Sequence, residues 1–248
     1  TYLPDHYGSV QPANQGDGID VGHLNEASSK HEILIEYAQL LGQQASNEKS
    51  GHTDSFLVSK SGKLLMEYYY RRGRINYPHY QMSITKSYTA LALGRAIQLG
   101  YLKMEDLNRP VHQLIDGLKV EDFAKGASGI SLDDALRMCS GIRMPKDRIL
   151  NAAKQDNMKG RAHAQALFSL SDPINDLSKE YKYQSADTIL VMQVIDSVVP
   201  GGAEKFIREE LFGPMGIDFY HWEKDLSGLP KAAAGSSALF RCQICGTE

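Results

Sequence analysis

The sequence has 248 residues, of which 42% are hydrophobic and 23% are charged, and its formal net charge is -3. These values are those of an ordinary globular protein with one large or two small domains. The basic residues are scattered and the densest group lies at residues 70–74, so the sequence indicates no nucleic-acid partner. No apolar run approaches the roughly 20 residues that a membrane-spanning helix needs, so we expect no membrane span.

The three cysteines are Cys139, Cys242 and Cys245. The last two form a single C-x-x-C with no second pair of cysteines or histidines behind it, so they cannot by themselves complete a four-ligand zinc site. We therefore expect no metal. The chain begins at Thr1 without an initiator Met or a signal peptide, which favours a periplasmic or secreted protein slightly over a cytoplasmic one.

The first part of the chain predicts an N-terminal extension over residues 1–45, with one amphipathic helix from Glu32 to Leu41. Residues 46–248 are then expected to form a single domain. Two apolar and aromatic runs, residues 55–60 and 63–70, flank the dipeptide Ser61-Gly62. A two-residue turn of this kind predicts an antiparallel hairpin. No glycine-rich phosphate-binding pattern follows either run, so nucleotide binding of that type has no support.

Residues 81–93 place Ser83 and Lys86 three residues apart at the start of a helix that we expect to end near Leu99, before Gly100. Side chains at this spacing share one helical face, and a lysine held close to a serine hydroxyl can accept its proton if burial and the helix N-terminus lower the pKa of the amine. The local alternative is a helix cap followed by a surface lysine. A second S-x-x-K, residues 46–49, lies in a polar run that reads as a solvated loop.

Further along, residues 130–141 predict a short helix capped by Ser131, with Asp134 in a capping box and Gly141 at its end. The sequence Tyr183-Gln184-Ser185 then precedes an apolar helix, and another helix follows after residues 200–202. A small antiparallel sheet followed by many helices predicts an α+β fold.

The order of these segments resembles that of the serine β-lactamase and penicillin-recognising family. Ser83 to Lys86 matches its S-x-x-K nucleophile motif, which is a known signature of that family. Residues 130–141 match its helical segment before the site, and Tyr183 to Ser185 matches its tyrosine motif. The resemblance covers roughly residues 50–240 and is closest to the branch of class C-like esterases and 6-aminohexanoate-oligomer hydrolases.

This resemblance implies a serine hydrolase that cleaves a small-molecule amide or ester through an acyl-enzyme, without a metal or organic cofactor. It implies that Ser83 attacks, that Lys86 holds the proton-accepting position, and that Tyr183 relays the proton. Ser185, at the third position of the tyrosine motif, would contact substrate. Because the family often has asparagine there, Ser185 favours ester or amide hydrolysis over β-lactam hydrolysis.

Several alternatives remain open at this point. Tyr181 is the nearest rival of Tyr183 among the 13 tyrosines. Tyr220 and Lys224 fit the Y-x-x-x-K of short-chain dehydrogenases, but no glycine-rich turn exists to hold a dinucleotide. The family's third motif, of Lys-Thr-Gly or His-x-Gly type, does not follow Tyr183, so the strands that would complete the family's sheet are expected to be missing. A non-catalytic binding protein that uses the same cleft is therefore the alternative function.

Overall fold

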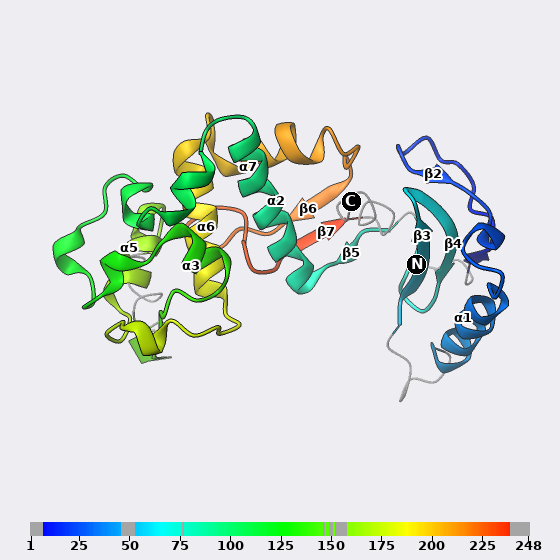
Figure 1. The fold of residues 1–248 in the computed structure, drawn as a ribbon, viewed down its shortest axis with the longest axis horizontal. Helices are drawn as coiled ribbons and strands as arrows, with labels where there is room; N and C mark the ends of the chain where they lie inside the picture. The colour runs from blue at the N-terminus through cyan, green and yellow to red at the C-terminus, as the bar shows by residue number, and fades with distance from the viewer. Residues whose placement is uncertain are drawn as a thin grey trace. The chain divides into compact units, whose positions relative to one another are not determined.

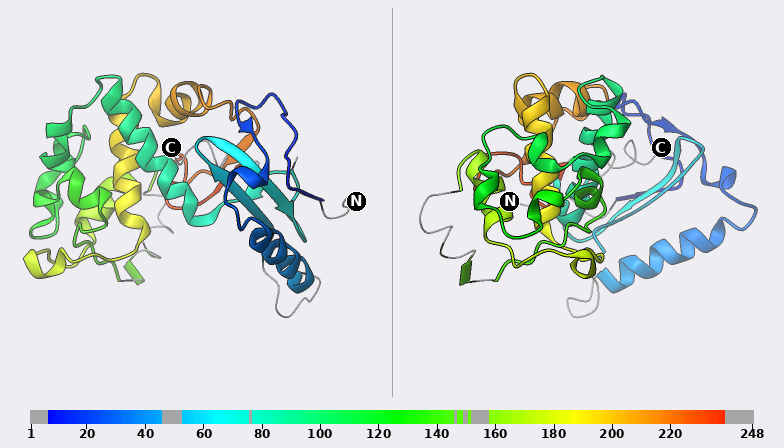
Figure 2. Two further views of the ribbon diagram at one scale, coloured as in Figure 1. Left: turned by 45° about the vertical axis from the view of Figure 1, so that its right-hand side comes forward. Right: turned by 60° about the vertical axis from the view of Figure 1, so that its left-hand side comes forward.

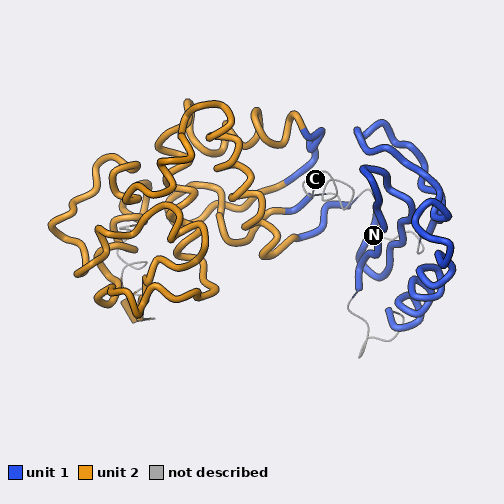
Figure 3. Tube along the Cα trace, in the orientation of Figure 1, with its two compact units in different colours: residues 1–80, 215–220, 237–248 blue, residues 81–214, 221–236 orange. Residues whose placement is uncertain are grey.

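The structure is a computed structural model that describes residues 7–45, 53–75, 77–145, 147–148, 151 and 158–238. Its contacts divide the chain into two compact units, which are drawn in different colours in Figure 3. The first unit holds residues 1–80, 215–220 and 237–248, and the second holds residues 81–214 and 221–236. The predicted S-x-x-K and tyrosine motifs both lie in the second unit. The predicted domain boundary after residue 45 stays a prediction.

The sheet of the first unit is built on the predicted hairpin, β3 (Ser55–Lys60) and β4 (Lys63–Tyr69). Ser61 and Gly62 both have positive φ, 51° and 75°, which is the backbone that a tight two-residue hairpin turn requires. The strands pair antiparallel, with a register shift between Val58 and Ser59. The hairpin and its turn were therefore predicted correctly.

Two short strands add to the other side of β4. β1 (Tyr7–Ser9) pairs with it antiparallel and β2 (Asp20–Val21) pairs with it in parallel. They were not predicted, because a strand of two or three residues is too short to show an alternating pattern. The residues before β3 thus contribute strands as well as a helix.

The predicted N-terminal helix is α1 (Glu32–Ala45), and it packs on the hairpin (Figure 1). The core of this unit contains Leu24, Ala38, Leu65 and Met66, all almost fully buried. The hydroxyl of Tyr70 donates a 2.7 Å hydrogen bond to the carbonyl oxygen of Ala38. A hairpin alone is marginal in water, so burying its apolar face under α1 is what stabilises it.

The second unit is mainly helical. Its central helix is α6 (Ser185–Val198), which packs against both α2 (Thr85–Gln98) and α3 (Leu132–Leu136), as Figures 1 and 2 show. Residues 190–195 of α6 are all buried. A buried apolar helix is covered by its neighbours on most sides. Packing on α6 therefore fixes the positions of α2 and α3 relative to each other.

The remaining elements complete the framework. The helices are α5 (Arg161–Ser169) and α7 (Gly202–Phe206), the second continued by a π-helical segment (Ile207–Phe212). In the first unit, β5 (His79–Tyr80) pairs antiparallel with β7 (Ser236–Ala238) through Ser237 and Ala238, and β6 (Tyr220–Trp222) is the third strand of that sheet. The mixture of small, largely antiparallel sheets and helices confirms the predicted α+β class.

Two predicted helix ends were wrong, and the first is that of α1, which runs to Ala45 instead of Leu41. The helix capped by Ser131 is α3, and it ends at Leu136 instead of continuing to Gly141. The predicted capping box is present, because Ser131 accepts from the Asp134 amide and Asp134 accepts from the Ser131 amide. The helix ends early because Met138 has a positive φ of 57°, which a right-handed helix cannot contain.

Candidate active site

Ser83 lies in a tight turn immediately before α2. Residues 82–84 form a single 3-10 turn, and the α-helical hydrogen bonding begins only at Thr85. Met82 has a φ of 47°, a backbone conformation that a residue with a side chain rarely adopts. The Ser83 side chain is exposed, and its amide N–H lies in a first helical turn, where such groups lack intrahelical acceptors. This turn therefore exposes Ser83 and places its amide among the N–H groups that begin a helix.

Lys86 lies beside Ser83, as its spacing predicts. The Lys86 Nζ is 3.0 Å from the Ser83 Oγ and 2.7 Å from the carbonyl oxygen of Ala233. The side chain of Lys86 is half-buried. Both neighbours are acceptors, so the amine is held by two hydrogen bonds that it donates.

Tyr183, which lies two residues before α6, completes the group. The Lys86 Nζ is 4.7 Å from the centroid of the Tyr183 ring. Hydrogen bonds from Ser83 and Lys86, with the positive charge of Lys86, hold the pKa of Tyr183 below its ordinary value. The rival Tyr181 makes no hydrogen bond or ring contact with another described residue and is 67% exposed. The structure thus brings together Ser83, Lys86 and Tyr183.

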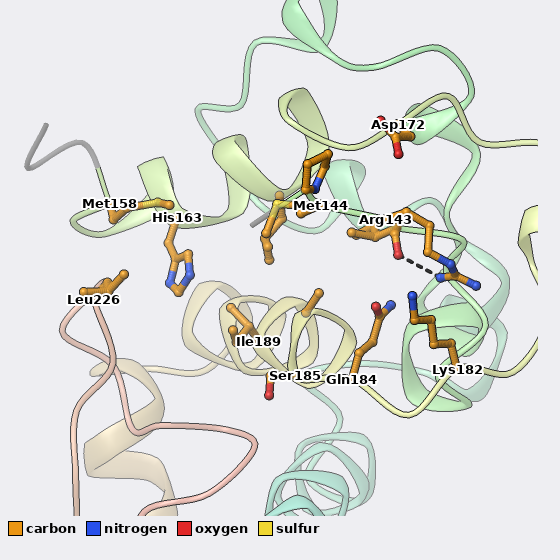
Figure 4. A pocket seen from close by; sticks show the side chains of 14 residues that line it. Arg143, Met144, Met158, His163, Asp172, Lys182, Gln184, Ser185, Ile189 and Leu226 are labelled. Atoms are coloured by element: carbon orange, nitrogen blue, oxygen red, sulfur yellow. Dashed lines mark hydrogen bonds between the residues drawn. The ribbon is translucent and has the colours of Figure 1, made fainter. Parts of the chain in front are cut away.

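Ser185 is placed differently from these three. It is the first residue of α6 and lines a cavity of about 510 Å³ together with Gln184. Its hydroxyl points away from that cavity (Figure 4). Within the described parts of the chain, no hydrogen bond joins this hydroxyl to Ser83, Lys86 or Tyr183. A contact between Ser185 and substrate stays a prediction.

Asp187 links the two motifs around the site, and the sequence analysis missed it. It is fully buried in α6, where its carboxylate accepts a 3.1 Å hydrogen bond from the amide of Ser140 and another from the side chain of Gln184. Burial raises the pKa of Asp187, although these hydrogen bonds oppose the rise. The amide of Lys182 also donates to the carbonyl of Met138, at 2.9 Å. The loop after α3 is therefore tied to the segment that carries Tyr183.

The segment from Ala232 to Ser236 is the second element that the sequence analysis missed. Besides the Ala233 carbonyl, it supplies the carbonyl of Ala232, which accepts from the Thr89 hydroxyl at 2.9 Å. The hydroxyls of Ser236 and Thr85 lie 2.7 Å apart and both are buried. Lys86 is thus oriented by a segment almost 150 residues further along the chain. The only local sign of this contact in the sequence is a pair of threonines, Thr85 and Thr89, one helical turn apart.

The structure also bears on other points raised by the sequence. Lys224 pairs with Glu204 at 2.8 Å, as an ordinary surface lysine does. No group of three or more potential metal-ligating residues occurs among the residues described. No helix in the described ranges is long and apolar enough to cross a membrane. The second S-x-x-K, residues 46–49, and the pair Cys242 and Cys245 lie outside the described residues.

Solved structures with the same fold are numerous. FmtA from Staphylococcus aureus has a TM-score of 0.62 at 14% identity, with 91% of this chain and 66% of that chain covered. A class C β-lactamase in complex with cefoxitin has a TM-score of 0.62 at 14% identity, over 86% and 64% of the two chains. A 6-aminohexanoate-dimer hydrolase homologue from Bacillus anthracis has a TM-score of 0.56 at 16% identity, over 82% and 53%. These likenesses show the fold, and the chain spans less than two thirds of the length of each.

Sequence comparison shows the family to which the chain belongs. No curated protein matches the chain. The family model described as Beta-lactamase matches residues 38–242, which include Ser83, Lys86, Tyr183 and the segment that orients Lys86. This match extends over far more than half of the chain. The protein therefore belongs to the β-lactamase family.

Proposed function

We propose that this protein is a serine hydrolase that cleaves an ester or amide bond through an acyl-enzyme, with Ser83 as the nucleophile. The observation that carries the proposal is the 3.0 Å contact between Lys86 Nζ and Ser83 Oγ, with the Tyr183 ring 4.7 Å from the same Nζ. A hydroxyl is a weak nucleophile until a neighbouring base takes its proton. The arrangement supplies such a base.

Tyr183 is the better base of the two. We take Lys86 as the ammonium, whose three N–H donors can serve the Ser83 Oγ, the Ala233 carbonyl and the Tyr183 oxygen together. An ammonium beside Tyr183 stabilises the phenolate, in agreement with the lowered pKa of Tyr183. We therefore assign proton removal from Ser83 to the Tyr183 phenolate. Lys86 keeps that phenolate charged and oriented.

The reaction then follows in two steps. As the Ser83 oxygen attacks the carbonyl carbon of the substrate, its proton passes to Tyr183, which returns a proton to the departing alcohol or amine. The amide of Ser83, in the turn before α2, is placed to donate to the developing oxyanion. Water repeats the sequence on the acyl-enzyme, with Tyr183 again as the base, and releases the acid. No step requires a metal.

The test is covalent labelling of Ser83. After incubation with a fluorophosphonate, intact-protein mass spectrometry should show one adduct on the natural protein and none on Ser83→Ala. Ser87→Ala is the matched control, because Ser87 is also exposed on α2 and should leave labelling intact. An adduct that survives Ser83→Ala would contradict the assignment of the nucleophile.

Turnover separates the enzyme from the alternative, a binding protein that uses the same cleft. Hydrolysis of p-nitrophenyl acetate that disappears in Ser83→Ala supports the enzyme. Binding of penicillin without any turnover of esters or amides would support the binding protein.

A further inference from the structure

The cavity that Ser185 lines has features that the proposed reaction does not use. Its volume of about 510 Å³ lies in the range of small-molecule sites. Ser83, Lys86 and Tyr183 are not among the residues that line it. In Figure 4, His163, Met158 and Leu226 lie at one end, Arg143, Lys182 and Gln184 at the other, with Met144 and Ile189 between. The cavity thus has two polar ends and an apolar middle.

The end at His163 is built around a buried imidazole that lies beside a carboxylate. His163 is 6% exposed, and its Nδ1 lies 3.4 Å from the Oδ2 of Asp225. The other oxygen of Asp225 accepts from both the amide and the hydroxyl of Ser227. Although burial alone would raise the pKa of Asp225, the contacts with His163 and Ser227 outweigh it and hold that pKa low. Asp225 therefore remains a carboxylate and fixes the orientation of the imidazole.

The imidazole of His163 has hydrogen-bonding capacity that the described residues do not satisfy. Although Asp225 lies nearby, the Nδ1 of His163 is buried without a hydrogen-bond partner among the described residues. The ring points toward Leu226 and Ile189, which line the cavity. A buried polar atom without a partner is costly, and an apolar ligand at this end would leave it so. A ligand with a hydroxyl, which can both donate and accept, is favoured instead.

The opposite end carries positive charge. Arg143 donates only to the carbonyls of Ile142 and Ser178, at 2.8 and 3.1 Å, and neither it nor Lys182 pairs with a carboxylate in the described ranges. The acidic residue of the lining, Asp172, is paired with Arg148 at 3.3 Å. A carboxylate is the group that these two cations would bind.

We propose that this cavity is a second binding site, which takes a hydroxycarboxylate with an unbranched apolar body. Its carboxylate binds Lys182 and Arg143, its methylene groups pack between Met144 and Ile189, and its distal hydroxyl forms a hydrogen bond with the imidazole of His163. The site is independent of Ser83. Its occupant is held by non-covalent contacts alone.

The test uses three probes of one chain length: 8-hydroxyoctanoate, octanoate and 1-octanol, each titrated into the natural protein by calorimetry. The hydroxycarboxylate should bind about tenfold more tightly than octanoate, which leaves the imidazole of His163 without a partner, and more tightly than 1-octanol, which lacks the charge. Equal affinity for 8-hydroxyoctanoate and octanoate, or no binding of any probe, would overturn the proposal.

Variants test the contribution of each end of the cavity to binding. His163→Phe should abolish the preference for the hydroxyl, whereas the exposed His221→Phe should keep it. Lys182→Met should weaken both carboxylates about tenfold and leave 1-octanol unchanged, with the exposed Lys119→Met as its control. If His163→Phe does not fold, Leu226→Trp provides the second measurement, because Leu226 is 52% exposed and a tryptophan there should block the cavity. Unchanged binding in Lys182→Met and Leu226→Trp would also contradict the site.

The proposed second site can be tested independently of the proposed hydrolase. Because Ser83 does not line the cavity, Ser83→Ala should bind 8-hydroxyoctanoate as the natural protein does. Loss of binding in Ser83→Ala would show that the probe occupies the active site and would overturn a second site. If a fluorophosphonate does not label Ser83 in the natural protein, the proposed hydrolase fails but the proposed second site is unaffected.

Discussion

The arrangement of donors and acceptors among Lys86, Ser83 and Tyr183 decides how the site would work. Lys86 has two acceptors around its amine, one of them the Ser83 hydroxyl, and the Tyr183 ring lies 4.7 Å from the same amine. A phenol next to an ammonium ionises more easily than one in water. The chemistry at the residue scale is therefore that of a phenolate maintained by a neighbouring cation.

The pH dependence of hydrolysis tests this assignment. Since the phenolate is the active form and the pKa of Tyr183 is lowered, kcat/KM should rise with pH along a limb centred below the ordinary tyrosine value. Lys86→Met should move that limb to higher pH, because the cation that lowers the pKa is gone. The measurement is kcat/KM for p-nitrophenyl acetate against pH. Tyr181→Phe should leave the profile unchanged, and a profile unaffected by Lys86→Met would contradict the coupling.

Lys86 and Tyr183 should also behave as one unit. Residues that act together give losses that do not multiply, so Lys86→Ala, Tyr183→Phe and the double variant should have similar kcat values, each reduced on the order of 10³-fold. Steady-state kinetics on one ester measures all three. A double variant whose loss equals the product of the single losses would mean that the two residues act independently.

At the scale of elements, the turn before α2 determines how Ser83 is presented. Met82 holds a positive φ of 47°, and its side chain is 61% exposed, so packing does not explain the choice of methionine. Backbone strain of this kind costs of order 1 kcal/mol or more and persists where surrounding contacts over-determine the conformation. Here the amide of Gln81, one residue earlier, is bonded to the carbonyl of Ser236 at 2.9 Å.

Substitutions at Met82 measure that strain. Met82→Val should lower the free energy of unfolding by about 1–2 kcal/mol, because a β-branched side chain tolerates positive φ poorly. Met82→Gly should leave it within about 1 kcal/mol, since relief of strain offsets the entropy of glycine. Urea unfolding provides both values. Ile84→Val, at a neighbouring position with helical φ, should change stability by less than about 0.5 kcal/mol, and a similar loss in Met82→Gly and Met82→Val would argue against strain.

Across the whole molecule, what the sequence could predict is what is encoded locally. The Ser61-Gly62 turn predicted the hairpin, the apolar period predicted α1 and α6, and the spacing of Ser83 and Lys86 predicted their contact. Local patterns do not encode contacts between distant segments. For that reason the sequence did not show that Asp187 holds the Ser140 amide, that the Ala233 carbonyl orients Lys86, or that Met82 adopts a positive φ.

Ser236 tests how much such distant contacts contribute to stability. Its buried hydroxyl lies 2.7 Å from that of Thr85 and 3.3 Å from the Gln81 side-chain oxygen. Ser236→Ala should reduce the free energy of unfolding by about 1–3 kcal/mol, because it leaves buried polar groups without a partner. Chemical denaturation measures the loss. Ser237→Ala removes a half-buried hydroxyl with no hydrogen bond in the described ranges, so a loss as large there would refute the explanation.

The contact between Thr85 and Ser236 also sets an order of events during synthesis. These residues are 151 positions apart, and ribosomes add on the order of 5–20 residues per second, so Ser236 follows Thr85 by roughly 8–30 seconds. During that interval the hydroxyls of Thr85 and Thr89 lack the hydrogen-bond partners that Ser236 and Ala232 supply. Ser83 is therefore synthesised long before the segment that orients Lys86. A nascent chain arrested before Ala232 should be inert toward fluorophosphonates and available to chaperones.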